Sequence, residues 1–168
     1  MSLRIVVPTS MLVDAVLATG TGSVAVEGPR LSGLAAGAGT GGVSIAPTSA
    51  GGSLKASTGT GSIDARFPSL DGARIQLGTG TGNVRLAVPA DAQHGYDVRA
   101  VTGTGLVSVD LPGAQDEEPP RRTAKHVRTA GYEARAIQVE AVASAGTGSL
   151  AVGAGEAPWS SPHRPHRQ

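Results

Sequence analysis

The chain has 168 residues, a formal net charge of +1, 25 glycines and only four aromatic residues, so it is long enough for one domain with a continuous core of small apolar side chains. The charge balance excludes a molecule that is steered as a whole to nucleic acid or to an anionic membrane. The absence of cysteine excludes disulfides, thiolate nucleophiles and Cys-based zinc or iron–sulfur sites.

The first twenty residues, MSLRIVVPTSMLVDAVLATG, predict a strand at Leu3, Ile5 and Val7 rather than a signal peptide. Pro8 and Asp14 interrupt the apolar stretch that a signal peptide needs before its cleavage site. No part of the sequence reaches the roughly 18 apolar residues of a membrane helix. The chain as written is therefore expected to be cytoplasmic and not inserted in a membrane, or surface-exposed or secreted if its start is truncated.

A repeat of about 21 residues follows, with a period in the range typical of repeat architectures. The triplet Gly-Thr-Gly recurs in steps of 19, 20, 21, 23 and 43 residues, the last being close to two periods. A proline trails most triplets by eight or nine residues. The corner repeat comprises Gly20, Thr21, Gly22, Gly39, Thr40, Gly41, Gly59, Thr60, Gly61, Gly80, Thr81, Gly82, Gly103, Thr104, Gly105, Gly146, Thr147 and Gly148.

Two short strands are predicted in each repeat, one on either side of the triplet. After the triplet, SIDARFP, NVRLAVP and LVSVDLP alternate apolar with polar residues, which is the period of a half-buried strand. Before the triplet, apolar residues stand two positions apart, as in the pairs Leu54/Ala56 and Ile75/Leu77, so that both members of a pair would point to the same face of a strand. Glycine allows the tight corner between the strands, and the threonines of successive corners would stack about 4.8 Å apart.

One repeat cannot bury its own apolar face, so neighbouring repeats must stack. We therefore predict an all-β parallel β-solenoid (β-helix), each strand pairing with its equivalent one repeat along. A propeller, in which the 43-residue step supplies a four-stranded blade, is the alternative architecture. The predicted domain covers 1–152, with a polar loop at 112–124, and 153–168 is expected to be a disordered tail.

The elements TGTGSI at 58–63 and TGTGNV at 79–84 resemble the bacterial putative adhesin domain family, a β-strand repeat domain of unknown function common in actinobacteria. Members repeat SGD-[VI]-x-[VL], and this chain has Ser, Gly, Asn or Leu in place of Asp at 23, 42, 62, 83, 106 and 149. The resemblance covers nearly all of 2–152. It implies a right-handed parallel β-solenoid and an adhesin-like role, and it supplies no catalytic residues.

No cofactor or metal is predicted. GAGTGG at 37–42 matches the dinucleotide fingerprint G-x-G-x-x-G, but a strand follows it where the fingerprint requires a helix. The corners lack the Asp of calcium-binding β-rolls. His163 and His166 are spaced for a metal but lie in the Pro-rich tail.

An outward charged face, made of Asp64, Arg85 and Asp110, is the one candidate for catalysis, and alternating charges on a solvated sheet are the commoner explanation for such a face. The pairs Thr19/Thr21, Thr58/Thr60, Thr79/Thr81 and Thr102/Thr104 could form two outward files like those of ice-binding solenoids.

The predicted function is a non-catalytic, adhesin-like scaffold or interaction module that presents extended parallel β faces to a protein or polysaccharide surface. Open solenoid ends, at Leu3–Val7 and at 137–152, allow self-association into a homo-oligomer. The alternatives are a carbohydrate-active β-helix enzyme and an ice-binding solenoid.

Overall fold

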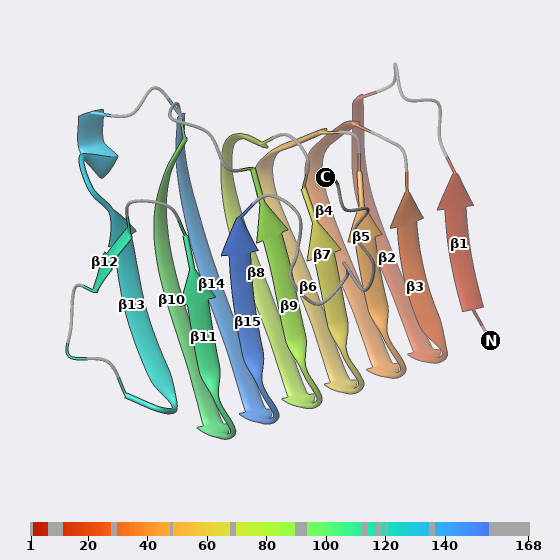
Figure 1. Ribbon diagram of the computed structural model, residues 1–168. Coiled ribbons are helices and arrows are strands. Elements are labelled where there is room, and N and C mark those ends of the chain that lie inside the picture. The colour runs from red at the N-terminus through yellow and green to blue at the C-terminus, as the bar shows by residue number, and fades with distance from the viewer. Residues whose placement is uncertain are drawn as a thin grey trace, which may run out of the picture.

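The computed structural model in Figure 1 describes residues 2–6, 12–27, 30–47, 49–67, 70–89, 94–111, 114–116, 119, 121–134 and 137–154. Its strands form two layers that face each other. Sheet A contains β1 (Ser2–Val6), β3 (Ser23–Glu27), β5 (Val43–Ala46), β7 (Ile63–Arg66), β9 (Val84–Val88), β11 (Val107–Asp110) and β15 (Leu150–Ala154). Sheet B contains β2 (Leu12–Thr21), β4 (Arg30–Thr40), β6 (Ser49–Thr60), β8 (Leu70–Thr81), β10 (His94–Thr104), β12 (Ala114–Asp116), β13 (Ala124–Thr129) and β14 (Ile137–Thr147).

Parallel pairing dominates both sheets. All strand pairs of sheet A are parallel. In sheet B the six long strands are parallel, and β12 and β13 are antiparallel additions at one edge. A one-turn 3₁₀ helix, η1 (Tyr132–Ala134), follows β13. The prediction of an all-β protein with parallel sheets is therefore confirmed.

Each Gly-Thr-Gly triplet joins a strand of sheet B to the next strand of sheet A. We number the resulting strand pairs as repeats 1 to 6, namely β2–β3, β4–β5, β6–β7, β8–β9, β10–β11 and β14–β15. The strands of sheet A are short, as predicted, whereas the six long parallel strands of sheet B contain 10 to 12 residues and are longer than predicted. Register shifts at Leu31/Gly33 and Gly51/Ser53 accommodate the extra residues of the longer strands as bulges.

The apolar core lies between the two sheets. Side chains that point inward from the two sheets are nearly inaccessible to solvent. Ile63, Ile75 and Val139, for example, are each 0% exposed. Two of the few aromatic residues, Phe67 and Tyr96, also join this core. The alternation in the sequence therefore separates the inner face of each strand from the outer face.

The spatial order of the repeats differs from their order in the sequence. Strand β14 lies between β8 and β10, and β15 lies between β9 and β11, so repeat 6 is inserted between repeats 4 and 5. Figure 1 shows this as blue strands flanked by green ones. The prediction that each strand pairs with the next repeat, and that 137–152 forms an end of the stack, is wrong at this point.

The hairpin of β12 and β13 accounts for the insertion. Residues 112–124, predicted to be a polar loop, include β12 and the first residue of β13. Strand β13 pairs antiparallel with the outer edge of β10, and the backbone carbonyls of Arg122 and Thr123 accept hydrogen bonds from Val107 and Thr102. Because this edge of β10 is occupied, β14 pairs with its other edge.

The two glycines of each triplet meet different constraints. The second glycine has a φ between +122° and +143° in all six repeats, a region that side chains strongly disfavour. The first glycine lacks that φ, but a Cβ on Gly59 would lie 2.7 Å from the carbonyl oxygen of Gly39 in the adjacent repeat. Backbone-to-backbone contact thus requires glycine at this position in repeats 2 to 6, whereas a Cβ on Gly20 in repeat 1 would meet no atom within 4 Å.

The threonines around the corners do not form two outward files. The middle threonines of the triplets are exposed, but Thr58, Thr79 and Thr102 are buried at 2 to 7% exposure. Their hydroxyls donate hydrogen bonds of 2.9 Å to the carbonyl oxygens of Gly41, Gly61 and Gly148 in neighbouring repeats. The prediction of two outward files is therefore wrong, because the residue before each triplet lies at a position that points into the core.

Three expectations fall on residues outside the described ones: the tail at 155–168 with His163 and His166, most of the corner prolines, and the side chains of the first strand. Residues 153 and 154, which the sequence predicts to lie in the tail, belong to β15. Among the described residues there is no helix of the length and hydrophobicity that a membrane span requires.

Candidate functional site

Polar side chains gather on the outer face of sheet B where β10 meets β13. The antiparallel register places Asp97 opposite Arg128 and Arg99 opposite His126. All four positions have outward parity, because the residues between them, Val98 and Val127, are buried. The hairpin thus brings residues about 30 positions apart in the sequence onto one patch.

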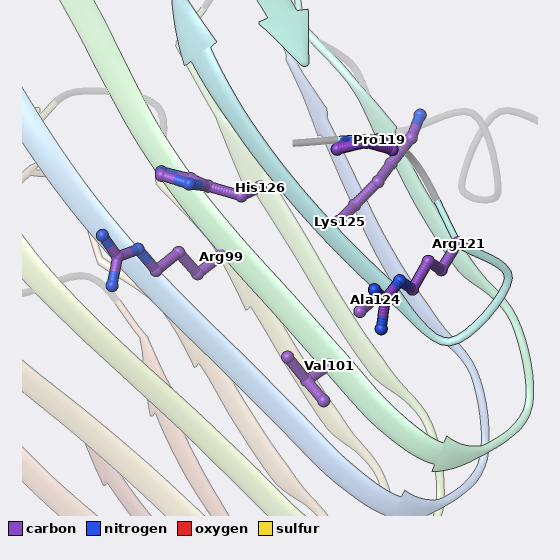
Figure 2. Close-up of a pocket in the computed structure, with 7 residues that line it drawn as sticks. All are labelled: Arg99, Val101, Pro119, Arg121, Ala124, Lys125 and His126. Atoms are coloured by element: carbon purple, nitrogen blue, oxygen red, sulfur yellow. The ribbon is translucent and has the colours of Figure 1, made fainter. Parts of the chain in front are cut away.

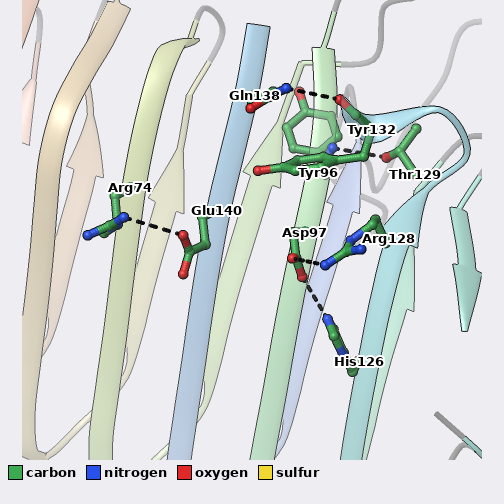
Figure 3. Close-up of polar contacts among 9 residues, drawn as sticks. All are labelled: Arg74, Tyr96, Asp97, His126, Arg128, Thr129, Tyr132, Gln138 and Glu140. Atoms are coloured by element: carbon green, nitrogen blue, oxygen red, sulfur yellow. Dashed lines mark hydrogen bonds and ion pairs between the residues drawn. The ribbon is translucent and has the colours of Figure 1, made fainter. Parts of the chain in front are cut away.

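The carboxylate of Asp97 is held by two basic side chains, as Figure 3 shows. One carboxylate oxygen lies 2.7 Å from Nε2 of His126, and the other accepts a hydrogen bond of 2.9 Å from Nη2 of Arg128. The side chains of Asp97 and His126 are each only 13% exposed. Burial by itself raises the pKa of Asp97, but the hydrogen bonds from Arg128 and His126 outweigh it and hold this pKa below its ordinary value of 3.8.

We expect the substitution Asp97→Asn to lower the free energy of unfolding by about 1–2 kcal/mol at pH 7. Because the folded-state pKa is depressed, the stabilisation is complete above the unfolded value and is lost as the pH falls through the folded value. Urea unfolding at pH 7 and at pH 2.5 measures this, and the difference between the variant and the parent should shrink at the lower pH. Asp110→Asn, at an exposed position of β11, is the control, and a constant difference at both pH values would contradict the assignment.

Further polar contacts surround this cluster. The guanidinium of Arg128 lies 5.5 Å from the centroid of the Tyr132 ring, a cation–π distance. Gln138 donates hydrogen bonds to the carbonyl oxygens of Tyr132 and Glu133. Burial, followed by the charges of Asp97 and Glu140, raises the pKa of Tyr132 above 10.0. These contacts fix η1 against the outer face of β10 and β14.

A pocket of about 240 Å³ lies beside the cluster, lined by Arg99, Val101, Pro119, Arg121, Ala124, Lys125 and His126. In Figure 2, Arg99 and His126 extend to the same side of the sheet, and Arg121 lies near Ala124. Lys125 leaves the opposite side of β13, toward Pro119. None of the seven lining residues is acidic, and two of the basic ones, Arg99 and Arg121, are exposed, so the pocket favours an anion.

The parallel register extends this patch into straight rows across sheet B. One row runs through Ala35, Lys55, Gln76, Val142, Arg99 and His126. The adjacent row, nearer to the corners, runs through Gly37, Ser57, Gly78, Ser144, Val101 and Ala124. A polar and partly basic row therefore lies beside a row of mostly small residues on a broad face.

The charged face predicted on sheet A is only partly assembled. Asp64 and Arg85 lie opposite each other on β7 and β9, and the Nε of Arg66 lies 3.6 Å from a carboxylate oxygen of Asp64. Asp110 does not join them, because the inserted β15 separates β11 from β9. The GAGTGG segment lies in β4 and the corner before β5, a strand–corner–strand setting.

Sequence reasoning missed Asp97, His126 and Arg128. Their local signal is the alternation in YDVRAV and KHVRT, which assigns each strand a polar face. The pairing of these two strands depends on the hairpin, in a segment that the sequence predicts to be a loop. In the described residues no three His, Asp or Glu side chains are grouped so that they could hold a metal ion.

Comparison with known proteins finds a structural likeness but no sequence match. No protein-family model matches the chain, and no curated protein matches it. A solved structure of a putative cell adhesion protein from Clostridium sporogenes aligns over 79% of this chain with a TM-score of 0.49 and 14% sequence identity. The alignment covers 56% of the length of that protein.

Proposed function

We propose that this chain is a non-catalytic, adhesin-like interaction module that binds an extended partner through the outer face of sheet B. The observation that carries the proposal is the register of six long parallel strands, which aligns equivalent outward positions in straight rows. Adjacent strands are about 4.8 Å apart. A face with this regular spacing suits a polymer that presents its own groups repeatedly.

The same regularity underlies the finer fold assignment. The two parallel sheets and the alternation of consecutive strands between them support a β-solenoid of roughly 21-residue repeats. We assign it the right-handed form, since connections between parallel strands of one sheet are right-handed in nearly all proteins. The TGTGSI and TGTGNV elements support placement in the bacterial putative adhesin domain family.

A binding assay combined with a turnover assay tests the proposed function. The purified chain is incubated with neutral and acidic polysaccharides, and both the bound protein and newly formed reducing ends are measured. We expect binding to at least one polymer without release of reducing ends. Release that disappears in Asp64→Asn would instead establish the alternative, a carbohydrate-active enzyme on sheet A. Failure to bind any polymer or cell-wall preparation would contradict the proposal that the chain is an interaction module.

Location is tested separately. The sequence predicts a cytoplasmic protein, whereas an adhesive module must reach the outside of the cell. Cell fractionation, followed by protease treatment of intact cells, distinguishes these two locations.

We expect self-association through the edges of sheet B to stop at a dimer. The hairpin of β12 and β13 covers one end of sheet B, while no described strand pairs with the outer edges of β1 and β2. Val16 on β2 is 80% exposed. In sheet B, two copies joined through their β2 edges leave only the ends that the hairpins cover. We expect sedimentation velocity to show monomer and dimer, and Val16→Lys to shift the equilibrium to monomer. Larger species growing with concentration would contradict this, and Val101→Lys at the covered end is the matched control.

A further inference from the structure

We infer that the pocket between β10 and β13 binds an acidic group of a polysaccharide, a sugar carboxylate or sulfate, and that the polymer crosses the strands of sheet B. This inference rests on the proposed function and specifies the class of partner. The residues that carry it are Arg99, Arg121, Val101 and Ala124.

The first step is the charge around the pocket. Asp97 is the one acidic residue of β10, and its two carboxylate oxygens already contact His126 and Arg128. Arg99 and Arg121 are exposed, and the residues that line the pocket include no acid. Guanidinium groups bind planar or tetrahedral oxyanions through paired N–H donors. The local positive potential is therefore available to a ligand.

The second step is the apolar surface beside the basic groups. Val101 is 52% exposed and pairs with Ala124 on the adjacent strand, and Pro119 also lines the pocket. An inorganic anion makes no use of such a surface. A sugar ring has C–H groups that pack on small apolar side chains while its acidic substituent reaches the arginines. The combination favours an acidic sugar over free phosphate.

The third step is the direction of the polymer. The row of small residues continues from the pocket through Ser144, Gly78 and Ser57, so a chain can lie close to the sheet. Beside it, Lys55 lies in the same row as Arg99, with β8 and β14 between their strands. At about 4.8 Å per strand, the two basic residues are about 14 Å apart. A second acidic group on the polymer can therefore reach Lys55.

The test measures binding of the full chain to four probes by biolayer interferometry: heparin as a sulfated polysaccharide, polygalacturonate as a carboxylated one, dextran as a neutral one, and polyphosphate. The double variant Arg99→Gln/Arg121→Gln removes the pocket charges. Arg66→Gln, on the outer face of sheet A, removes one positive charge outside the pocket and is the control. Val101→Glu is a second pocket variant that places a negative charge on an exposed position. Thermal unfolding of each variant verifies that it is folded.

We expect heparin or polygalacturonate to bind, and the double variant and Val101→Glu each to weaken this binding at least about tenfold, which corresponds to about 1.4 kcal/mol, because they remove or oppose the charged donors that hold the acidic group. Arg66→Gln should bind like the parent. An equal loss in Arg66→Gln would overturn the site, because charge alone would then explain binding. Polyphosphate bound as tightly as the polysaccharides would overturn the sugar assignment. Binding to dextran without binding to either acidic polymer would overturn this inference and leave the proposed function intact.

Discussion

Gly61→Ala should destabilise the protein by more than about 3 kcal/mol, one of the largest effects expected of any single substitution in this chain. Gly61 has a φ of +143°, and a Cβ at this position would lie only 1.9 Å from the carbonyl oxygen of Gly41. The neighbouring atom is backbone and its repeat is paired on both sides, so it cannot move away without breaking ladder hydrogen bonds. Chemical unfolding followed by circular dichroism measures the effect.

Substitutions of two other glycines distinguish the two causes of this effect, the positive φ and the steric clash of the Cβ. Gly131 has a φ of +70°, but a Cβ on this residue would have no neighbouring atom within 4 Å, so Gly131→Ala should cost only about 1–2 kcal/mol through its backbone conformation. Gly59 has no positive φ, but its Cβ would crowd Gly39 at 2.7 Å. An intermediate cost is expected for Gly59→Ala. Equal stability of the Gly61 and Gly131 variants would contradict close stacking of the corners.

Removal of 137–168 should have the second large effect, lowering the midpoint of thermal unfolding by more than about 10 °C. This truncation deletes repeat 6, whose Val139, Ala141 and Leu150 are at most 2% exposed. Repeat 6 pairs on both sides, with repeats 4 and 5. Its loss therefore leaves unpaired strand edges inside the stack as well as an apolar gap.

A truncation at the other end is the control for this experiment. Removal of residues 1–22 deletes β1 and β2, which lie at the ends of their sheets, and exposes a new edge without opening a gap. It should lower the midpoint less than removal of 137–168. A synthetic peptide of 137–154 added to the C-terminal truncation should restore part of the lost stability. Equal midpoints for the two truncations, with no effect of the peptide, would contradict the inserted position of repeat 6.

Local patterns in the sequence are sufficient to identify the elements of sheet A and the inner face of both sheets. The alternation in SIDARFP and NVRLAVP arises because the opposite sheet buries one side of each strand. Whether a residue is apolar then depends on the side of its own strand to which it points. The same is true of the second glycine of each triplet, whose φ is a property of the local corner. These features depend on residues that are close together in the sequence, so the sequence alone predicts them.

The outer faces are less predictable from local patterns, because few apolar residues constrain the choice there. Asp64 and Arg85 are expected to meet and do lie opposite each other, because repeats 3 and 4 stack in sequence order. Asp110 is expected beside them and lies elsewhere. No local pattern predicts that Asp97, His126 and Arg128 meet, yet they form the most buried polar cluster among the described side-chain ion pairs.

By itself, the sequence determined that the chain is all-β, that its repeats are about 21 residues long, and that glycine corners join strands with one apolar side. Only the tertiary structure decided the order of the repeats, the inward direction of Thr58, Thr79 and Thr102, and the basic pocket beside Asp97. The physical reason is that all six repeats offer nearly equivalent edges for pairing. The hairpin of β12 and β13 occupies one edge of β10 and leaves the other for β14, and this competition between distant segments is invisible in local patterns.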